Sequence, residues 1–365
     1  MAQQGTVEGM VTNIFGGLYA GRRVLITGHT GFKGSWLALW LRELGAELTG
    51  IALAPESTPN HWDLLGITLD DYRIDINNAA AIREAIHLAR PDMVFHLAAQ
   101  PLVRRSYRHP LETWSTNVMG TAHILDALRD IDTVKAIVVV TTDKCYENKE
   151  WVWGYREDES LGGHDPYSNS KACSELLTMS FRDSFFSDGP PIATARAGNV
   201  IGGGDWSEDR LIPDCVRALK LGQSVILRYP DAIRPWQHVL EPLSGYLALA
   251  QGLVDAPQKT PRAVNFGPDP ASFCTVREVV DAFGARFAGK PGWVRDPAPQ
   301  PREAQALTLS SALAGQSLGW HPRLDIRESL SWTADWYLAH SAGENMLAFS
   351  EAQIARYRDL MKRSL

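Results

Sequence analysis

A tyrosine and a lysine stand four residues apart in a segment whose pattern is typical of one long helix. Tyr167 and Lys171 have this spacing, which places both side chains on one helix face. A phenol has a pKa of about 10 and is a poor base at neutral pH, but a neighbouring ammonium favours the phenolate. Thr142, at the end of an upstream strand of mostly β-branched residues, could hydrogen-bond the reacting oxygen. The three residues therefore indicate proton transfer at a hydroxyl or carbonyl oxygen.

A glycine-rich turn follows the first predicted strand, Arg23–Thr27, and opens the first predicted helix. Its glycines are spaced GxxGxxG, which allows a tight turn and lets the backbone approach a pyrophosphate, while the helix N-terminus offers free N–H groups. The turn is not a P-loop, because Lys33 is followed by Gly34 rather than by Ser or Thr. We expect it to bind a dinucleotide, the alternative being an ordinary turn between strand and helix. The residues expected to hold the dinucleotide here are Gly28, Thr30, Gly31, Phe32, Lys33 and Gly34.

The tip of the second predicted strand, residues 47–53, bears on the identity of the dinucleotide. An acidic residue about 20 positions after the glycine turn would bind the adenosine ribose of NAD, whereas an arginine would favour the 2′-phosphate of NADP. Neither an acidic residue nor an arginine stands at the tip of this strand, and Glu56 comes three residues after its end. Asp75 is a candidate for binding the adenine amino group, with a helix cap or a loop carboxylate as the alternative.

Strands and helices alternate through the first half of the chain. Besides the elements around the glycine turn, we expect strands at 47–53, 93–96, 137–141 and 192–196, and helices at 78–89, 116–128 and 166–186. This alternation predicts an α/β fold with a Rossmann-type, doubly wound parallel sheet. After Asn199, glycines and prolines separate shorter elements, which indicates a smaller, mainly C-terminal substrate-binding lobe.

We divide the chain into four parts on these grounds. They are an N-terminal extension at residues 1–20, a dinucleotide-binding domain at 21–198, a substrate lobe at 199–340 and a C-terminal tail at 341–365. This division leaves open that some elements within residues 199–340 belong to the parallel sheet rather than to the substrate lobe.

The composition excludes several classes of protein. With 365 residues, of which 45% are hydrophobic and 21% charged, the chain can bury a core and is not mostly disordered. A net charge of −6 argues against a general nucleic-acid partner, and the apolar stretches fall short of the roughly 20 residues of a membrane span. The N-terminus lacks a basic segment followed by an apolar run, so we expect a cytoplasmic protein. The four cysteines form no CxxC pair, so we expect reduced thiols and no metal site.

Several of these features together resemble the extended short-chain dehydrogenase/reductases. The matching features are the glycine turn, the strand end from His96 to Ala99, Asn117, and the Tyr167/Lys171 pair. Five longer segments resemble one branch of that superfamily, the nucleotide-sugar 4,6-dehydratases that act on CDP-D-glucose. These segments are residues 27–36, 98–104, 142–148, 196–206 and 234–245.

The resemblance implies a three-step reaction that regenerates its cofactor, NAD. A hydride leaves C4 of the sugar, water is lost across C5 and C6, and the hydride returns to C6. A C4 ketone acidifies the C5 proton, and the C6 hydroxyl is then β to the carbanion, so oxidation activates the elimination. The implied product is CDP-4-dehydro-6-deoxy-D-glucose, of use in nucleotide-sugar and dideoxyhexose biosynthesis for lipopolysaccharide O-antigens.

The resemblance also implies residue roles. Tyr167 acts on the C4 hydroxyl with Lys171 and Thr142, and Asp143 protonates the departing C6 hydroxyl. Lys144 either acts as a neutral base at C5 or stays charged and stabilises the enolate. Further NAD-binding residues are expected to be Asp75, Ile76, Leu97, Ala98 and Ala99, together with Tyr167 and Lys171. The residues expected to bind CDP-D-glucose are Gln100, Arg104, Asn117, Asn199, Arg210 and Arg234, the last two at the diphosphate.

Other interpretations remain open at this point. A 4-epimerase or a different nucleotide-sugar dehydratase would share the scaffold, but an epimerase needs no Asp143/Lys144 pair. A non-catalytic NAD-binding protein would need only the glycine turn. The family tends to have an acidic residue where this chain has Ser310, which puts a nucleotide contact there in doubt. Family members pair through two long helices, here 116–128 and 166–186, which implies a homodimer or homotetramer.

Overall fold

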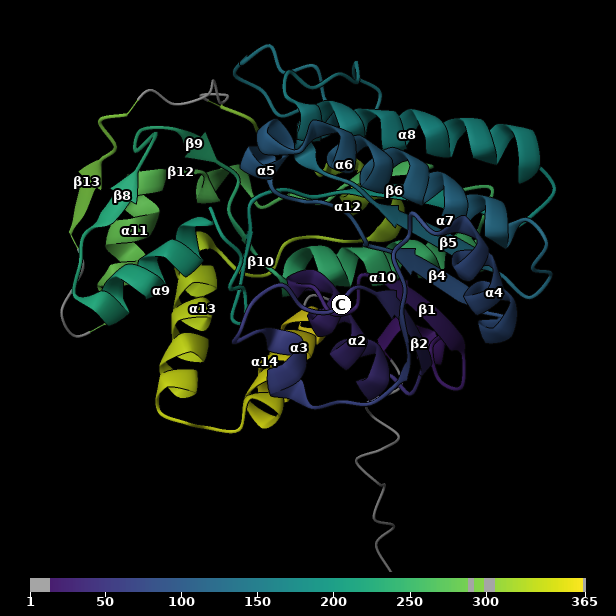
Figure 1. Ribbon diagram of the computed structural model, residues 1–365, viewed down its shortest axis with the longest axis horizontal. Helices are drawn as coiled ribbons and strands as arrows, with labels where there is room; N and C mark the ends of the chain where they lie inside the picture. The colour runs from purple at the N-terminus through teal and green to yellow at the C-terminus, as the bar shows by residue number, and fades with distance from the viewer. Residues whose placement is uncertain (1–13, 288–291, 299–305, 364–365) are drawn as a thin grey trace, which may run out of the picture.

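The computed structural model describes residues 14–287, 292–298 and 306–363 (Figure 1). Its centre is a sheet of seven strands in the order β11-β6-β5-β4-β1-β2-β3, in which every neighbouring pair is parallel. The strands are β1 Arg23–Thr27, β2 Glu47–Ala52, β3 Asp70–Arg73, β4 Met93–His96, β5 Ala136–Val140, β6 Ile192–Arg196 and β11 Ala263–Asn265. The predicted Rossmann-type parallel sheet is therefore confirmed.

Both faces of the sheet are covered, as a parallel sheet requires. Every residue of β4 and β5 is buried. Successive side chains point to opposite faces, so Val24 and Ile26 enter one core cluster while Leu25 enters the other. Figure 1 shows helices on both sides of the sheet. Helices α2 Phe32–Glu43 and α10 Leu240–Asp255 cover one face, and α4 Ala79–Ala89, α7 Gly120–Leu128 and α8 Pro166–Phe185 cover the other.

The strand order reverses between β1 and β4, which creates the crevice where such sheets bind their ligands. The segment after β4 leads into α5 Val103–Arg108 and α6 Pro110–Trp114. A wide π-helical turn at Ser115–Met119 then joins α6 to α7. The helix predicted at 116–128 therefore begins earlier and contains a π turn, a feature that is frequent at functional sites.

A smaller lobe stands beside the sheet, on the left in Figure 1. Its elements are α9 Leu211–Leu221, β8 Val225–Leu227, β9 Ile233–Arg234, β12 Cys274–Thr275, α11 Val276–Gly284 and β13 Trp293–Arg295. Strand β8 pairs with β13 in parallel and β9 pairs with β12 in antiparallel fashion. Between these pieces the chain returns to the sheet, because α10 packs on β5 and β6 and β11 is the strand next to β6.

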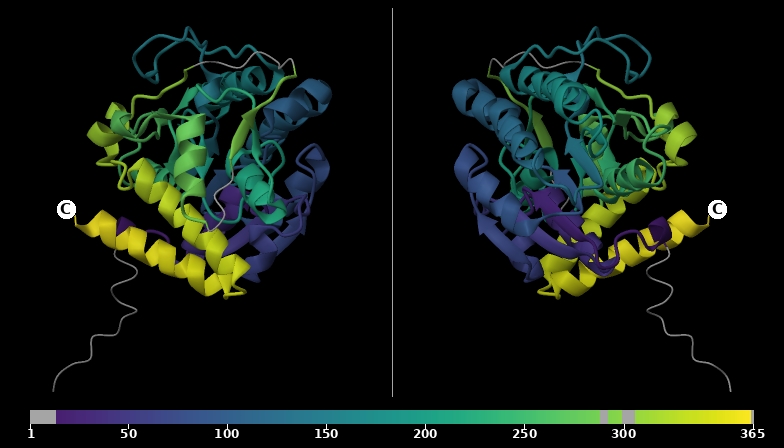
Figure 2. Two further views of the ribbon diagram at one scale, coloured as in Figure 1. Left: turned by 90° about the vertical axis from the view of Figure 1, so that its left-hand side faces the viewer. Right: turned by 90° about the vertical axis from the view of Figure 1, so that its right-hand side faces the viewer.

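Three further helices complete the chain, namely α12 Ala312–Leu318, α13 Ile326–Ser341 and α14 Met346–Lys362. The segment that we expected to be a C-terminal tail contains α14, which packs against α2 and against α3 His61–Leu65 (Figure 2). Its Tyr357 is fully buried with its ring 5.7 Å from that of Trp40. Residues 1–13 of the expected N-terminal extension lie outside the described residues. No helix within the described ranges is long and apolar enough to cross a membrane.

Candidate active site

The glycine turn is packed too closely for side chains at two of its glycines. Gly28 has φ +77°, and a Cβ there would lie 2.8 Å from the backbone nitrogen of Ala98. A Cβ on Gly34 would lie 2.0 Å from the carbonyl oxygen of Gly28. Thr30 fixes the turn by donating to the carbonyl of Leu53, 2.8 Å away. The first turn of α2 has no side-chain cap, and free N–H groups at a helix N-terminus suit a pyrophosphate. These residues therefore fit a dinucleotide.

Asp75 and Ile76 follow β3, the edge strand of the sheet next to β2. The Asp75 carboxylate accepts from the backbone N–H and the side-chain amide of Asn77, at 2.9 and 3.0 Å. Ile76 is buried against Gly120, where a Cβ would lie 2.4 Å from its Cδ1. The Asp75 carboxylate thus orders the loop before α4, and Ile76 packs this loop against α7.

An arginine stands beside the tip of β2, which the sequence of that strand alone did not reveal. Arg73 comes from β3 and donates to the carbonyl of Leu53 over 3.2 Å. Its guanidinium is also paired with Asp71, 2.6 Å away, which balances its charge. The expectation that no arginine stands at this tip is therefore corrected, since β2 and β3 are neighbours in the sheet.

The loop after β4 is held by hydrogen bonds from both sides. Thr27 accepts from the backbone N–H groups of Leu97 and Ala98, each at 3.1 Å, and Ala99 follows them. The buried Asn117 side chain accepts from the Gln100 N–H at 2.8 Å and donates to the Gln100 carbonyl at 3.1 Å. It also donates to Ser170 on α8, 2.8 Å away. Asn117 and Gln100, both predicted to bind substrate, therefore join the loop to α8, and neither is among the residues that line the cavity described below.

Three catalytic candidates meet at the end of β5. Thr142 donates to Oδ1 of the fully buried Asp143 at 2.9 Å. The Lys144 ammonium lies 3.4 Å from the same oxygen and faces the cavity. The other oxygen, Oδ2, accepts from the Asn199 side chain at 3.1 Å. Asn199 adopts φ +49°, a conformation that asparagine tolerates better than most residues. The structure thus brings Asn199, predicted to bind substrate, against the predicted acid.

Tyr167 and Lys171 lie on one face of α8 and are both buried. Burial raises the pKa of Tyr167 to about 12, against the Thr142 hydrogen bond and the positive charge of Arg210, which lower it. Burial lowers the pKa of Lys171 to about 8, against the negative charge of Glu175. The Lys171 ammonium donates to the carbonyl of Val140 at the end of β5, 3.2 Å away. The phenol is therefore protonated at neutral pH in the protein alone and needs further positive charge to act as a base.

Lys33 of the glycine turn lies close enough to Lys171 and Lys144 for their charges to affect it. Its Nζ lies 3.4 Å from the hydroxyl of Tyr246. Burial lowers its pKa to about 7, and the positive charges of Arg210, Lys171 and Lys144 act in the same direction. Lys33 is therefore a cation whose charge changes near neutral pH, in the space between the turn and the catalytic candidates.

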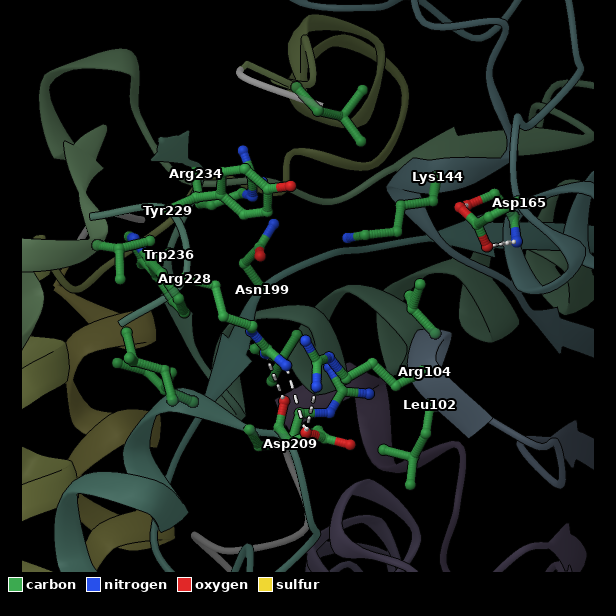
Figure 3. Close-up of a pocket in the computed structure, with 18 of the residues that line it drawn as sticks. Leu102, Arg104, Lys144, Asp165, Asn199, Asp209, Arg228, Tyr229, Arg234 and Trp236 are labelled. Atoms are coloured by element: carbon green, nitrogen blue, oxygen red, sulfur yellow. Dashed lines mark hydrogen bonds and ion pairs between the residues drawn. The ribbon is translucent and has the colours of Figure 1, made fainter. Parts of the chain in front are cut away.

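A cavity of about 460 Å³ opens between the sheet and the smaller lobe. Figure 3 shows Lys144 and Asn199 pointing toward one another across its centre, with arginines below and beside them. The predicted substrate residues that line it are Arg104, Asn199, Arg210 and Arg234. Among the described residues four arginines line it, because Arg228 joins the three above from the end of β8. Such a lining suits a diphosphate.

The comparisons with known proteins agree with this geometry. A family model described as GDP-mannose 4,6 dehydratase matches residues 25–333. The chain belongs to this family. Among curated members, the chain is 47% identical over 347 residues to CDP-glucose 4,6-dehydratase from Salmonella typhimurium, which covers 93% of this chain and 97% of the relative. It is 32% identical to dTDP-glucose 4,6-dehydratase from Streptomyces antibioticus, covering 86% and 92%.

Solved structures share the fold of this dehydratase family and of its epimerase relatives. An epimerase from Methanothermobacter thermautotrophicus, Mth375, has a TM-score of 0.78 at 23% identity, covering 92% of this chain and 98% of that one. A UDP-glucose 4-epimerase from Thermus thermophilus, in complex with NAD, has a TM-score of 0.74 at 24% identity, covering 86% and 98%. The predicted resemblance to the extended short-chain dehydrogenase/reductases is confirmed.

Sequence analysis of this dehydratase did not single out Arg228, Tyr229 and Asp209, which line the cavity. Arg228 lies 3.2 Å from Asp209, and Tyr229 follows it. Asp209 is also 3.9 Å from Arg104, so one carboxylate stands among the arginines. The position of Asp209, directly before the predicted diphosphate ligand Arg210, was a signal in the sequence that it lines the same cavity. Ser310 lies elsewhere, where its backbone N–H donates to the carbonyl of Tyr155, 2.9 Å away.

Proposed function

We propose that this protein is an NAD-dependent nucleotide-sugar dehydratase that converts CDP-D-glucose to CDP-4-dehydro-6-deoxy-D-glucose. The choice of CDP-D-glucose as substrate rests on one observation, the identity of 47%, over nearly the whole of both chains, to a CDP-glucose 4,6-dehydratase. The arrangement of Asp143 and Lys144 beside Thr142, with Lys144 facing the cavity, supports the dehydration step.

The first step removes a proton from the C4 hydroxyl. When bound, the dinucleotide would accept the hydride as NAD⁺ in this step and return it as NADH in the last one, and the glycine turn with the first turn of α2 would hold its diphosphate. Tyr167 takes the C4 proton. The Thr142 hydroxyl, which donates to Asp143 in the protein alone, turns to donate to the same C4 oxygen. Lys171 holds the phenolate by its charge, because an ammonium beside a phenol favours the ionised form. The positive nicotinamide adds to this effect, which offsets the rise of the Tyr167 pKa to about 12.

The second step removes water across C5 and C6. Asp143, in its protonated form, gives a proton to the departing C6 hydroxyl. Lys144 lies 3.4 Å from it and faces the cavity, so it reaches the C5 side of a bound sugar. There Lys144, as a neutral amine, takes the C5 proton, and the ammonium so formed stabilises the enolate oxygen.

The arginines of the cavity would bind the two phosphates. A guanidinium matches phosphate oxygens with two parallel hydrogen bonds. Arg104, Arg210, Arg228 and Arg234 come from both sides of the cavity. This arrangement supports a diphosphate bound between the lobes, and we propose that the sugar lies toward Asn199 and the nucleobase toward β8.

A 4-epimerase is the second candidate, since such enzymes share the fold. An epimerase needs only the Thr142, Tyr167 and Lys171 group. The buried carboxylate of Asp143, held by three donors, favours the dehydratase.

The proposal includes a homo-oligomer in the cytoplasm. Large apolar side chains on the outside of the helical layer support the oligomer. They are Leu176 and Met179 of α8, Met119 of the π turn and Leu111 of α6. Two copies that bring these helices together would bury them.

Turnover of nucleotide sugars tests the function. Purified protein is incubated with equal concentrations of CDP-D-glucose, dTDP-D-glucose, UDP-D-glucose and GDP-D-mannose, and the ketosugar is followed by its absorbance in alkali. We expect CDP-D-glucose to react fastest and denatured protein to release NAD(H). A 4-epimer as the product, preference for another nucleotide, or release of NADP(H) alone would contradict the proposal.

A further inference from the structure

A buried ion pair lies behind the catalytic segment, by which we mean residues 142–145. Glu175 of α8 and Arg196 of β6 meet through two hydrogen bonds, at 3.0 and 2.8 Å. Their side chains are 1% and 3% exposed. Neither residue has a part in the steps above. Buried pairs of this kind are costly to desolvate, and apolar side chains of similar volume are often as stable, so the contacts of this pair call for an explanation.

The carboxylate of Glu175 also accepts from two threonine hydroxyls. One belongs to Thr141, directly before the catalytic segment, and donates to Oε1. The other belongs to Thr194 in the middle of β6 and donates to Oε2 over 2.7 Å. Both threonines are buried.

The guanidinium of Arg196 contacts the residue on the other side of the segment. Its Nη1 donates to the hydroxyl of Tyr146 at 2.7 Å. The guanidinium carbon also lies 5.0 Å from the centre of the Tyr146 ring, a cation–π distance. The Glu157 carbonyl accepts a further hydrogen bond from Nη1, at 3.0 Å.

The two contacts bracket the catalytic segment. Thr141 precedes residue 142 and is bonded to Glu175, and Tyr146 follows residue 145 and is bonded to Arg196. The segment between them consists of Thr142 and the single 3₁₀ turn Asp143–Cys145 that it caps. Glu175 itself lies one helical turn after Lys171, so the pair is attached to the same helix as the Tyr167–Lys171 group.

We infer that the Glu175–Arg196 pair positions the catalytic segment against α8, through Thr141 at one end and Tyr146 at the other. The inference rests on the proposed function for its catalytic consequence. Because Asp143 and Lys144 lie in the segment while Tyr167 and Lys171 lie on α8, a loosened segment impairs the elimination more than the oxidation. Glu175 and Arg196 are positioning residues, since they act through their neighbours.

Two isosteric variants separate positioning from general support of the core. Thr141→Val and Thr194→Val each remove one buried hydroxyl that donates to Glu175, but only Thr141 adjoins the catalytic segment. We expect Thr141→Val to lower kcat about fivefold or more, with KM for CDP-D-glucose nearly unchanged, as loss of one hydrogen bond predicts. Enzyme-bound NADH should accumulate in this variant, at about 340 nm, because oxidation outruns elimination. Thr194→Val should keep the kcat of the wild type and accumulate no NADH.

Tyr146→Phe tests the other end of the segment and serves if Thr141→Val fails to fold. It removes the hydroxyl bonded to Arg196 and keeps the ring. We expect the same accumulation of NADH as in Thr141→Val. Equal losses in the two threonine variants, or no accumulation of NADH in either Thr141→Val or Tyr146→Phe, would overturn the inference.

Hydrogen exchange gives a readout that does not depend on activity. The backbone amides of residues 142–146 should exchange faster in Thr141→Val than in Thr194→Val or in the wild type. If the wild type fails to turn over CDP-D-glucose, the proposed function is wrong, and the exchange difference still decides whether the pair positions the segment. Identical exchange rates of these amides in Thr141→Val and Thr194→Val would show that the pair does not position the segment.

Discussion

The α-carbon of Gly198 faces the carboxylate of Asp143. A Cβ added to Gly198 would lie 2.0 Å from Asp143 Cγ and 2.0 Å from Oδ2. The next residue, Asn199, donates to the same Oδ2. The loop after β6 therefore contacts the Asp143 carboxylate at two points. The carboxylate packs against the backbone of Gly198, where there is no room for a side chain, and it accepts a hydrogen bond from Asn199.

Replacing Gly198 by alanine should displace Asp143 while leaving Tyr167 and Lys171 in place. We expect turnover of CDP-D-glucose to fall by about 10²-fold, the lower end for loss of a general acid, with accumulation of bound NADH. Gly292→Ala is a matched control, since the atom nearest to a Cβ there is Ser224 Oγ, at an ordinary 3.5 Å. A loss of turnover without NADH in Gly198→Ala would mean that the oxidation itself depends on this contact.

Oxidation and elimination should be separable by single substitutions. Tyr167→Phe removes the base for the C4 hydroxyl, so no NADH should form. Lys144→Met and Asp143→Asn leave oxidation possible and stall the elimination, so bound NADH should build up at about 340 nm while turnover falls roughly 10²–10⁴-fold. Absorbance after mixing with CDP-D-glucose measures this. NADH in Tyr167→Phe alone would reverse the roles, and full activity in Lys144→Met would remove Lys144 from the mechanism.

Binding of NAD⁺ should weaken as the pH falls through about 7. Burial lowers the pKa of Lys33 to about 7, so Lys33 is largely neutral at pH 8 and charged at pH 6. The charged form would repel a positive nicotinamide bound beside Lys171, because Lys33 lies close enough to Lys171 for their charges to interact. We expect the Kd for NAD⁺ to rise several-fold between pH 8 and pH 6, as one unit of pKa shift is about tenfold in binding. Calorimetric titration measures it, and Lys33→Met should show a smaller rise in Kd, with the remainder coming from Lys171, whose pKa is about 8. An undiminished pH dependence in Lys33→Met would assign it to another group.

The exposed apolar side chains of α8 should hold a homodimer together. Figure 1 shows α7 and α8 side by side on the outside of the molecule, and Leu176 and Met179 are 52% and 41% exposed there. The double variant Leu176→Glu with Met179→Glu should be monomeric by light scattering at micromolar concentration. Leu221→Glu, on α9 and 68% exposed, is the control and should keep the oligomeric state of the wild type. A monomeric wild type would contradict the oligomer.

Local sequence was enough to predict the parts of the site that lie within one segment. The glycine turn, the Tyr167–Lys171 spacing and the run from Thr142 to Lys144 each sit on one element or at its end. Apolar runs also sufficed for five of the seven strands, because strands buried on both faces are almost wholly apolar. Strands β3 and β11 were not predicted, since β3 is polar and mostly exposed at the edge of the sheet and β11 has only three residues.

Contacts between distant segments could not be read in the same way. Arg73 reaches the tip of β2 from β3, and Arg228 reaches the cavity from β8, whose partner β13 lies about 70 residues further on. Asn117 and Gln100 were expected to bind substrate from the family resemblance. In the structure the Asn117 side chain bonds the backbone of Gln100, and the Gln100 side chain accepts from the Leu102 N–H. Helix α14 was missed because its buried residues, such as Ile354 and Tyr357, are interspersed with charged ones.

The path of the chain between the two lobes limits how this protein could acquire a new substrate. The chain leaves the sheet after β6 for α9, β8 and β9, returns for α10 and β11, and leaves again for β12, α11 and β13. No single contiguous stretch therefore encodes the substrate half, and a cut after residue 198 would separate β11 from the other six strands. Grafting a relative's lobe would require several coordinated exchanges at once. Changes of specificity are more accessible one cavity residue at a time, at positions such as Arg228 and Tyr229, without disturbing the sheet that carries the chemistry.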